Sequence, residues 1–129
     1  MDGMTDPAAD PATAFRRAIE RGDVDAAVAL FAPDAVFHSP VVHKPYQGRE
    51  ALRAILTAVV QVFGDFRYTG SYAGETGHVL EFATRVGDRD LQGVDILRGT
   101  GDTLTELTVL VRPYSAATLL RERMAALLS

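Results

Sequence analysis

The fold of this chain is decided by residues 79–97, which read VLEFATRVGDRDLQGVDIL. Apolar and polar residues alternate on both sides of a glycine-containing turn at 87–90, and this pattern predicts two antiparallel strands joined as a hairpin. Pairing across that turn places Phe82 opposite Asp95. The alternation also puts Asp95 on the same face of its strand as Leu97. A carboxyl group is therefore expected within an apolar surface.

Asp95 has the clearest chemical implication of any residue in this stretch. The next strand, predicted at 103–112, brings Leu107 and Val109 to the same face, so apolar side chains surround the carboxyl. Burying an unpaired carboxylate is unfavourable, so the group either finds a partner or stays protonated. We interpret this as a lined cavity in which Asp95 acts as a general acid or base. Two alternatives stay open: a one-residue slip would turn Asp95 to solvent, or its carboxyl accepts backbone hydrogen bonds in a structural role.

Length and composition indicate one domain with its own core. The chain has 129 residues, 47% of them hydrophobic, and no apolar run approaches the ~18 residues of a membrane span. The net charge is −4 and there is no basic cluster, so nucleic acid is not an expected partner. The absence of cysteine excludes disulfides and thiolate chemistry. Because the first residues lack the apolar stretch of a signal peptide, we expect a cytoplasmic protein without membrane contact.

Periodicity along the chain predicts an α+β domain. Residues 1–10 are expected to be a polar leader and 11–129 a single domain. Helical spacing predicts four helices, which lie between Pro11 and Gly22, between Asp23 and Pro33, over 49–63, and after a capping Ser115. Alternation predicts five strands, at 34–38, 66–72, 79–86, 91–97 and 103–112. Helices on one face of such an antiparallel sheet make an α+β fold.

Residues 18–52, AIERGDVDAAVALFAPDAVFHSPVVHKPYQGREAL, resemble the opening of nuclear transport factor 2-like proteins, in particular SnoaL-like domains. The later segments GVDILR at 93–98 and LTELTVLVRP at 104–113 are similar to the last two strands of that family. The resemblance implies a cone-shaped, cystatin-like domain in which helices pack on the concave face of a curved antiparallel sheet and enclose a pocket, usually in a dimer. Members include ketosteroid isomerases, limonene epoxide hydrolases, polyketide cyclases, dehydratases and non-enzymatic binding proteins, so the fold alone does not fix the function.

The resemblance carries over to individual residues only in part. Ketosteroid isomerases have a buried, protonated aspartic acid at the strand position that Asp95 matches. Their catalytic base aligns with Ser39, and their tyrosine on the first helix aligns with Phe15. An arginine that limonene epoxide hydrolases require aligns with Gly93. The SnoaL-like cyclases use a cavity aspartate with a nearby histidine, and here Asp95 and His38 are the nearest match.

His38 is therefore the second candidate catalytic residue. It ends the first strand, where the cavity of the family opens, and a histidine there can relay a proton near neutral pH. The alternative is a partly exposed histidine at a strand end. The chain's three histidines lack the spacing of a zinc site, and neither a metal nor a cofactor is expected.

The candidate pocket residues share an inward position and an apolar or aromatic side chain. They are Phe15, Tyr46, Tyr68, Phe82, Leu97, Leu107 and Val109. Tyr68 is expected to lie in one row with Phe82 and Asp95, so that its hydroxyl group hydrogen-bonds the carboxyl.

These features predict binding of a small, largely apolar organic molecule, with acid/base catalysis of the isomerase, cyclase or hydrolase type at Asp95. The alternative is a non-catalytic small-molecule carrier or a dimerisation module. The outer sheet face would carry Val94, Ile96 and Leu110 among charges of both signs, which predicts a homodimer through that face. An ordinary surface with a few exposed aliphatic side chains is the other interpretation.

Overall fold

The computed structural model describes residues 10–128. The expected leader, 1–10, lies outside the described residues except for Asp10. The elements of the described part, in chain order, are α1 (Pro11–Glu20), α2 (Val24–Ala29), β1 (Phe31–His38), β2 (Tyr46–Gln47), α3 (Arg49–Val62), β3 (Phe63–Ala73), β4 (His78–Val86), β5 (Arg89–Thr100), β6 (Thr103–Arg112) and α4 (Tyr114–Leu128).

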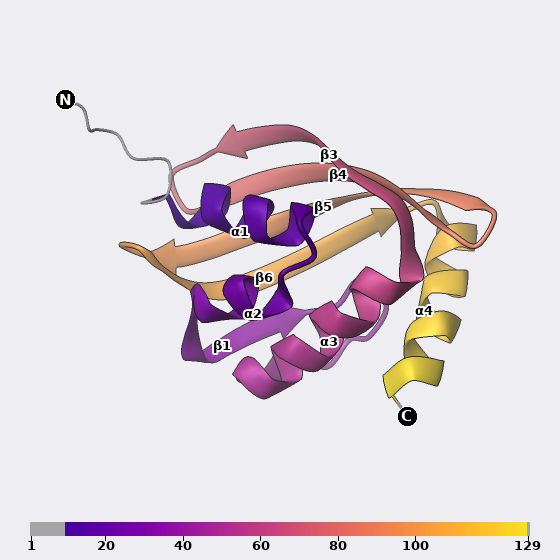
Figure 1. The fold of residues 1–129 in the computed structure, drawn as a ribbon, viewed down its shortest axis with the longest axis horizontal. Coiled ribbons are helices and arrows are strands. Elements are labelled where there is room, and N and C mark those ends of the chain that lie inside the picture. Colours follow the sequence, from indigo (N-terminus) through magenta and orange to yellow (C-terminus); the bar gives the residue numbers. More distant parts are fainter. Residues whose placement is uncertain (1–9, 129) are drawn as a thin grey trace.

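The strands form one curved sheet in the order β2-β1-β6-β5-β4-β3 (Figure 1). Strands β3 to β6 make an antiparallel meander, whereas β1 pairs with β6 in parallel. The expected α+β class and curved sheet are thus confirmed, with the difference that the sheet is mixed. Strand β1 can run parallel to β6 because α3 and the whole meander separate the two strands along the chain. Helices α1 to α3 cover one face of the sheet, and α4 lies at one end against α3 and strands β4 to β6.

Local sequence signals explain where the first two helices begin. The Asp10 carboxylate accepts a hydrogen bond from the Ala12 amide at 3.1 Å, and Pro11 occupies the first helical position. Asp23 caps α2 in the same way, accepting from the Ala26 amide at 3.0 Å. Both caps agree with the sequence prediction.

Several boundaries differ from the prediction, and the short strand β2 was not predicted. Strand β1 begins at Phe31 and contains Pro33, which was expected to end the preceding helix. The pairing of β1 with β6 is irregular between Phe31 and Val36, and a proline without an amide hydrogen is tolerated at such a place. Helix α4 begins at Tyr114, so Ser115 lies inside it and is not its cap.

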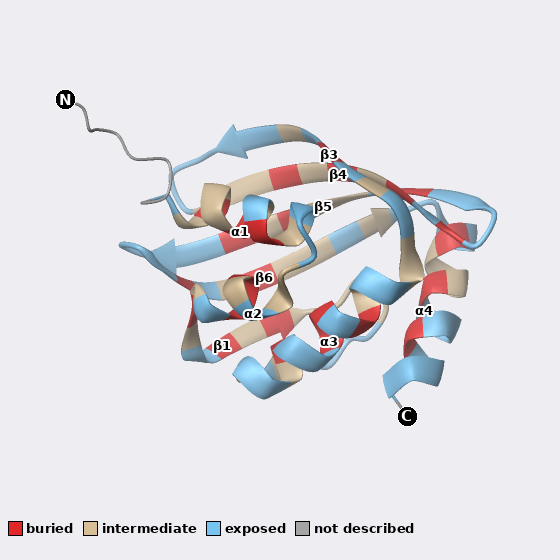
Figure 2. Ribbon diagram, in the orientation of Figure 1, coloured by how far each residue is buried: buried red, intermediate tan, exposed pale blue. Residues whose placement is uncertain are grey.

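The β4–β5 hairpin is tighter than expected. Val86 pairs with Arg89 across a two-residue turn, so Leu80 lies opposite Asp95. The predicted pairing of Phe82 with Asp95 is therefore wrong by two positions, and Phe82 lies opposite Gly93 instead. A shift of two residues leaves every side chain on its predicted face. Asp95 accordingly stays on the inner face, where the buried residues gather between the sheet and the helices (Figure 2).

Gly93 is required by the close approach of its neighbours. A Cβ atom at this position would lie 2.5 Å from Cζ of Phe82 and 2.6 Å from the carbonyl oxygen of Leu110. The second contact is with backbone, which cannot move aside without disturbing the sheet. Phe82 thus packs where a side chain at position 93 would otherwise be.

We predict that Gly93→Ala lowers the free energy of unfolding by about 1–3 kcal/mol, because the added methyl group overpacks the β4–β6 region. The denaturant midpoint measures this loss. Gly64→Ala is the matched control, since its Cβ would meet only the Arg85 carbonyl oxygen at 3.9 Å. Equal midpoints for the two variants would contradict the assigned packing.

Candidate functional site

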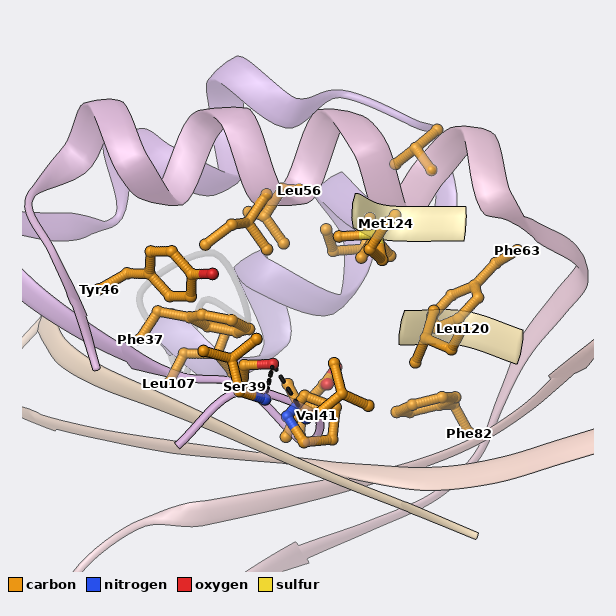
Figure 3. Close-up of a pocket in the computed structure, with 18 of the residues that line it drawn as sticks. Phe37, Ser39, Val41, Tyr46, Leu56, Phe63, Phe82, Leu107, Leu120 and Met124 are labelled. Atoms are coloured by element: carbon orange, nitrogen blue, oxygen red, sulfur yellow. Dashed lines mark hydrogen bonds between the residues drawn. The ribbon is translucent and has the colours of Figure 1, made fainter. Parts of the chain in front are cut away.

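A cavity of about 390 Å³ lies between the inner face of the sheet and the helices. Most of its wall is apolar, as the side chains around it in Figure 3 show. Its polar lining residues are Ser39, Tyr46, Tyr68, Asp95 and Arg121. The volume suits a small organic ligand, and the few polar groups in an apolar wall are typical of a small-molecule site.

The Asp95 carboxyl is buried in this wall. Its residue is 8% exposed, and the Tyr68 hydroxyl donates a hydrogen bond to Oδ2 at 2.8 Å. Burial raises the pKa of Asp95 from 3.8 to about 7, and the hydrogen bond from Tyr68 acts in the opposite direction. Burial, followed by the nearby charge of Asp95, raises the pKa of Tyr68 above its ordinary value. Tyr68 therefore stays a donor, while Asp95 exchanges a proton near neutral pH.

The second oxygen of Asp95 is free to meet a ligand. Within residues 10–128, Tyr68 is the only hydrogen-bond partner of this side chain. A buried carboxyl oxygen without a protein partner is unfavourable. A polar group of a bound molecule would remove that penalty.

A bulge in β3 supplies the aromatic surroundings of this pair. Three steps from Gly64 to Arg67 face two steps on β4, so β3 contains an extra residue, and Asp65 there has a φ of 51°. As a result both Phe63 and Phe66 line the cavity, with ring centroids 5.8 Å apart. Phe66 also contacts the Tyr68 ring edge-on at 4.9 Å.

Neighbouring rings and one cation hold Tyr68 in place. Its ring meets Phe82 edge-on at a centroid distance of 6.5 Å. The guanidinium carbon of Arg16, from α1, lies 5.4 Å from the centroid of the same ring. Arg16 in turn forms an ion pair with Glu20, whose Oε2 lies 3.2 Å from Nε of Arg16. These contacts order the tyrosine that donates to Asp95.

The structure brings together most of the expected pocket residues. Those that line the cavity are Phe15, Tyr46, Tyr68, Phe82, Leu107 and Val109. Leu97 does not line it, and its side chain packs within the hydrophobic core instead. The expected hydrogen bond between Tyr68 and Asp95 is present.

The expected approach of His38 to Asp95 does not occur. Phe37 lines the cavity, so the next residue along β1 projects to the opposite face of the sheet. There Nε2 of His38 lies 2.6 Å from Oε2 of Glu106. His38 is not among the lining residues, and of the two side chains expected beside Asp95 only Tyr68 contacts it.

The helical walls are the part of the site that sequence reasoning did not assign to residues. Helix α3 contributes Ile55, Leu56, Val59 and Val60, and α4 contributes Leu120, Arg121, Met124, Ala125 and Leu128. Both helices have an apolar face that the sequence pattern shows. An apolar face that packs into a core has the same pattern as one that lines a cavity, so the pattern does not distinguish the two. The loop after β1 also lines the cavity through residues 39–42.

Residues 10–128 contain no group of three or more His, Cys, Asp or Glu side chains placed to hold a metal ion. No helix in this range is long and apolar enough to cross a membrane.

Comparisons with known proteins agree with this geometry. The model of the family described as SnoaL-like domain matches residues 12–112. Comparison with curated proteins gave no match.

Solved structures resemble the chain over nearly its full length. A steroid delta-isomerase from Pseudomonas aeruginosa is 37% identical, with a TM-score of 0.88 over 99% of this chain and 96% of that one. An uncharacterised bacterial protein with a cystatin-like fold from Silicibacter pomeroyi is 32% identical, with a TM-score of 0.85 over 92% and 84%. An NTF2-like protein from Cytophaga hutchinsonii shares the fold, at 14% identity and a TM-score of 0.66 over 89% and 97%.

We predict that Asp95 makes the protein less stable as the pH rises. Folding raises the pKa of Asp95 from 3.8 to about 7. Its ionisation therefore has no effect on the free energy of unfolding below about pH 4, lowers that free energy increasingly between pH 4 and 7, and lowers it by a constant ~4 kcal/mol at higher pH. Asp95→Asn should remove this dependence, and Asp95→Leu should be at least as stable as wild type at about pH 8. Urea unfolding at several pH values measures both effects. Asp90→Asn, an exposed aspartate of β5, is the matched control; parallel profiles for wild type and Asp95→Asn would contradict the raised pKa.

Proposed function

This chain belongs to the SnoaL-like domain family, and from that premise we propose that its cavity binds a small, largely apolar molecule with which Asp95 exchanges a proton. The observation that carries the proposal is a buried carboxyl in an apolar cavity with one oxygen free. A raised pKa near the working pH is what general acid/base catalysis requires.

The proton transfer that we propose needs no cofactor. Ionised Asp95 removes a proton from the carbon beside a ligand carbonyl, and the electron pair of that C–H bond forms an enolate. When the ligand has a β,γ double bond, the enolate is conjugated with it, and the protonated carboxyl returns the proton to the γ carbon, which gives the α,β-unsaturated isomer and restores the carboxylate. Tyr68 holds the other carboxyl oxygen throughout and so orients Asp95.

Similarity to the steroid delta-isomerase supports the isomerase type, although the catalytic groups are distributed differently. The resemblance assigns a tyrosine to the position of Phe15 and a base to that of Ser39, and both positions line the cavity. Here the phenol beside the strand acid comes from Tyr68 on β3. With no carboxylate at position 39, the role of base falls to Asp95.

We predict that Asp95→Asn lowers the rate of isomerisation of a β,γ-unsaturated ketone by about 100-fold or more, because a general base is removed while the shape is kept. An unsaturated 3-ketosteroid and 3-cyclohexenone are suitable substrates, followed by the absorbance of the conjugated product. The wild-type rate should rise with pH through about 7 and then level off.

Two further variants make this test specific. Tyr68→Phe removes the hydrogen bond that lowers the pKa of Asp95. The rise of the isomerisation rate with pH should therefore occur at higher pH in this variant than in wild type. Asp90→Asn should leave the rate unchanged. Equal rates for wild type and Asp95→Asn would contradict catalysis, and ligand binding without turnover would identify a carrier.

We also propose that the protein is a cytoplasmic homodimer formed through the outer sheet face. Val94 pairs with Leu110 and Ile96 with Thr108, so the apolar residues of this face are adjacent. Leu110 is 54% exposed. Arg112, which donates a hydrogen bond to Gln92 at 2.6 Å, lies at the polar edge of this patch.

Leu110→Asp should therefore weaken the dimer by about tenfold or more, because it places like charges across a two-fold interface. Light scattering coupled to size-exclusion chromatography gives the mass at several concentrations. Leu127→Asp is the control, since Leu127 is 46% exposed and lies on α4. A monomeric wild-type protein would rule out the proposed dimer.

A further inference from the structure

We propose that Ser39 and Tyr46 form a second polar subsite, at which two hydroxyl groups donate hydrogen bonds to an oxygen of the ligand. This inference rests on the proposed function, because it assumes that the ligand occupies the same cavity. It goes further by stating what the ligand carries: an oxygen function at each end of an apolar body.

The hydroxyl of Ser39 has one remaining capacity, which is to donate. Its oxygen accepts hydrogen bonds from the amides of Val41 at 3.0 Å and Val42 at 3.2 Å (Figure 3). These two bonds occupy both lone pairs of the oxygen. Within residues 10–128 the Ser39 proton has no acceptor, and the residue lines the cavity. The turn after β1 thus presents an oriented donor to the cavity.

Tyr46 adds a second donor on the same wall. It pairs with Phe37 across β1 and β2, so the two side chains lie on the same face of the sheet, with ring centroids 6.2 Å apart. Figure 3 shows the Tyr46 hydroxyl directed toward the interior of the cavity. In the described part of the chain this hydroxyl has no hydrogen-bond partner. A ligand oxygen near both groups would satisfy two donors at once.

The order of the strands sets the distance between this subsite and Asp95. Strand β6 separates β1 from β5, and β2 lies one strand further out. With a spacing of about 4.8 Å between strands, the backbones of β1 and β2 lie roughly 10–14 Å from that of β5 along the sheet. The wall between them is apolar, with Phe37 and Leu107 on it. The ligand class that fits is an elongated apolar molecule with an enolisable carbonyl at the Asp95 end and an acceptor oxygen at the other.

Two ketone probes that differ in one hydroxyl group test this subsite. They are 4-phenylcyclohexanone and 4-(4-hydroxyphenyl)cyclohexanone, whose second oxygen lies at the far end from the carbonyl. Wild-type protein should bind the hydroxylated probe about tenfold more tightly, as expected for a well-placed hydrogen bond. Calorimetric titration gives both dissociation constants.

Variants at positions 46 and 39 test whether a preference for the hydroxylated probe comes from the proposed subsite. Tyr46→Phe should reduce the preference, which is the ratio of the two dissociation constants, several-fold. Ser39→Ala removes the other hydroxyl donor, so it should also reduce the preference. Tyr72→Phe is the control, because Tyr72 is an exposed tyrosine bonded to Glu81 at 3.0 Å outside the cavity.

The possible outcomes separate the two proposals. Equal binding of both probes by wild type would overturn the subsite and leave the proposed function standing. A preference that survives in both Tyr46→Phe and Ser39→Ala would also overturn the subsite. Failure of wild type to bind either probe would count against the proposed function itself.

Discussion

The hydrogen bond from Tyr68 to Asp95 is the interaction on which the organisation of the cavity depends. It holds a carboxyl group inside an apolar wall, where its charged form is poorly solvated. The two residues come from β3 and β5, which are separated by β4 alone. Phe82 on that middle strand packs over Gly93, which has no side chain in its way, and its ring meets that of Tyr68 edge-on. The bulged, glycine-containing sheet is therefore what allows one acid to be buried next to one phenol.

The sequence was sufficient to place Asp95 on the inner face but not to name its neighbours. Alternation in a strand determines the face, and an error of two residues in the turn leaves the face unchanged. The cross-strand partners do depend on the turn, so the tighter turn at Gly87 moved Leu80 to the place expected for Phe82. Face and register are thus separate questions, and only the first can be answered from periodicity. The bond with Tyr68 was expected from a row shared with Phe82 and Asp95. That row contains Gly93 in place of Asp95, and the bond still forms because a tyrosine side chain can reach a diagonal neighbour.

The other differences between the expected and the observed pocket residues also arise because a sequence pattern does not determine tertiary contacts. His38 was chosen because it ends a strand near the cavity. Side chains alternate between the two faces of a strand, however, and Phe37 is the one that points inward. Leu97 has the inward face expected of it, but neighbouring side chains cover it completely. Conversely, the apolar stripe of α3 gives no indication that Val59 borders empty space. Whether an inward residue packs or lines a cavity is decided by how the helices are spaced, and that depends on the whole tertiary structure.

The position of α4 has a consequence for how the chain could diversify. This helix begins at Tyr114, beyond the segment 12–112 that the family model matches, and its 15 residues still supply part of the cavity wall. Asp95 and Tyr68 lie inside the matched segment. One part of the cavity wall therefore comes from outside the segment that contains the buried acid and its phenol. Exchanging the terminal helix would change which molecules the cavity admits, while the acid and its phenol would be inherited intact.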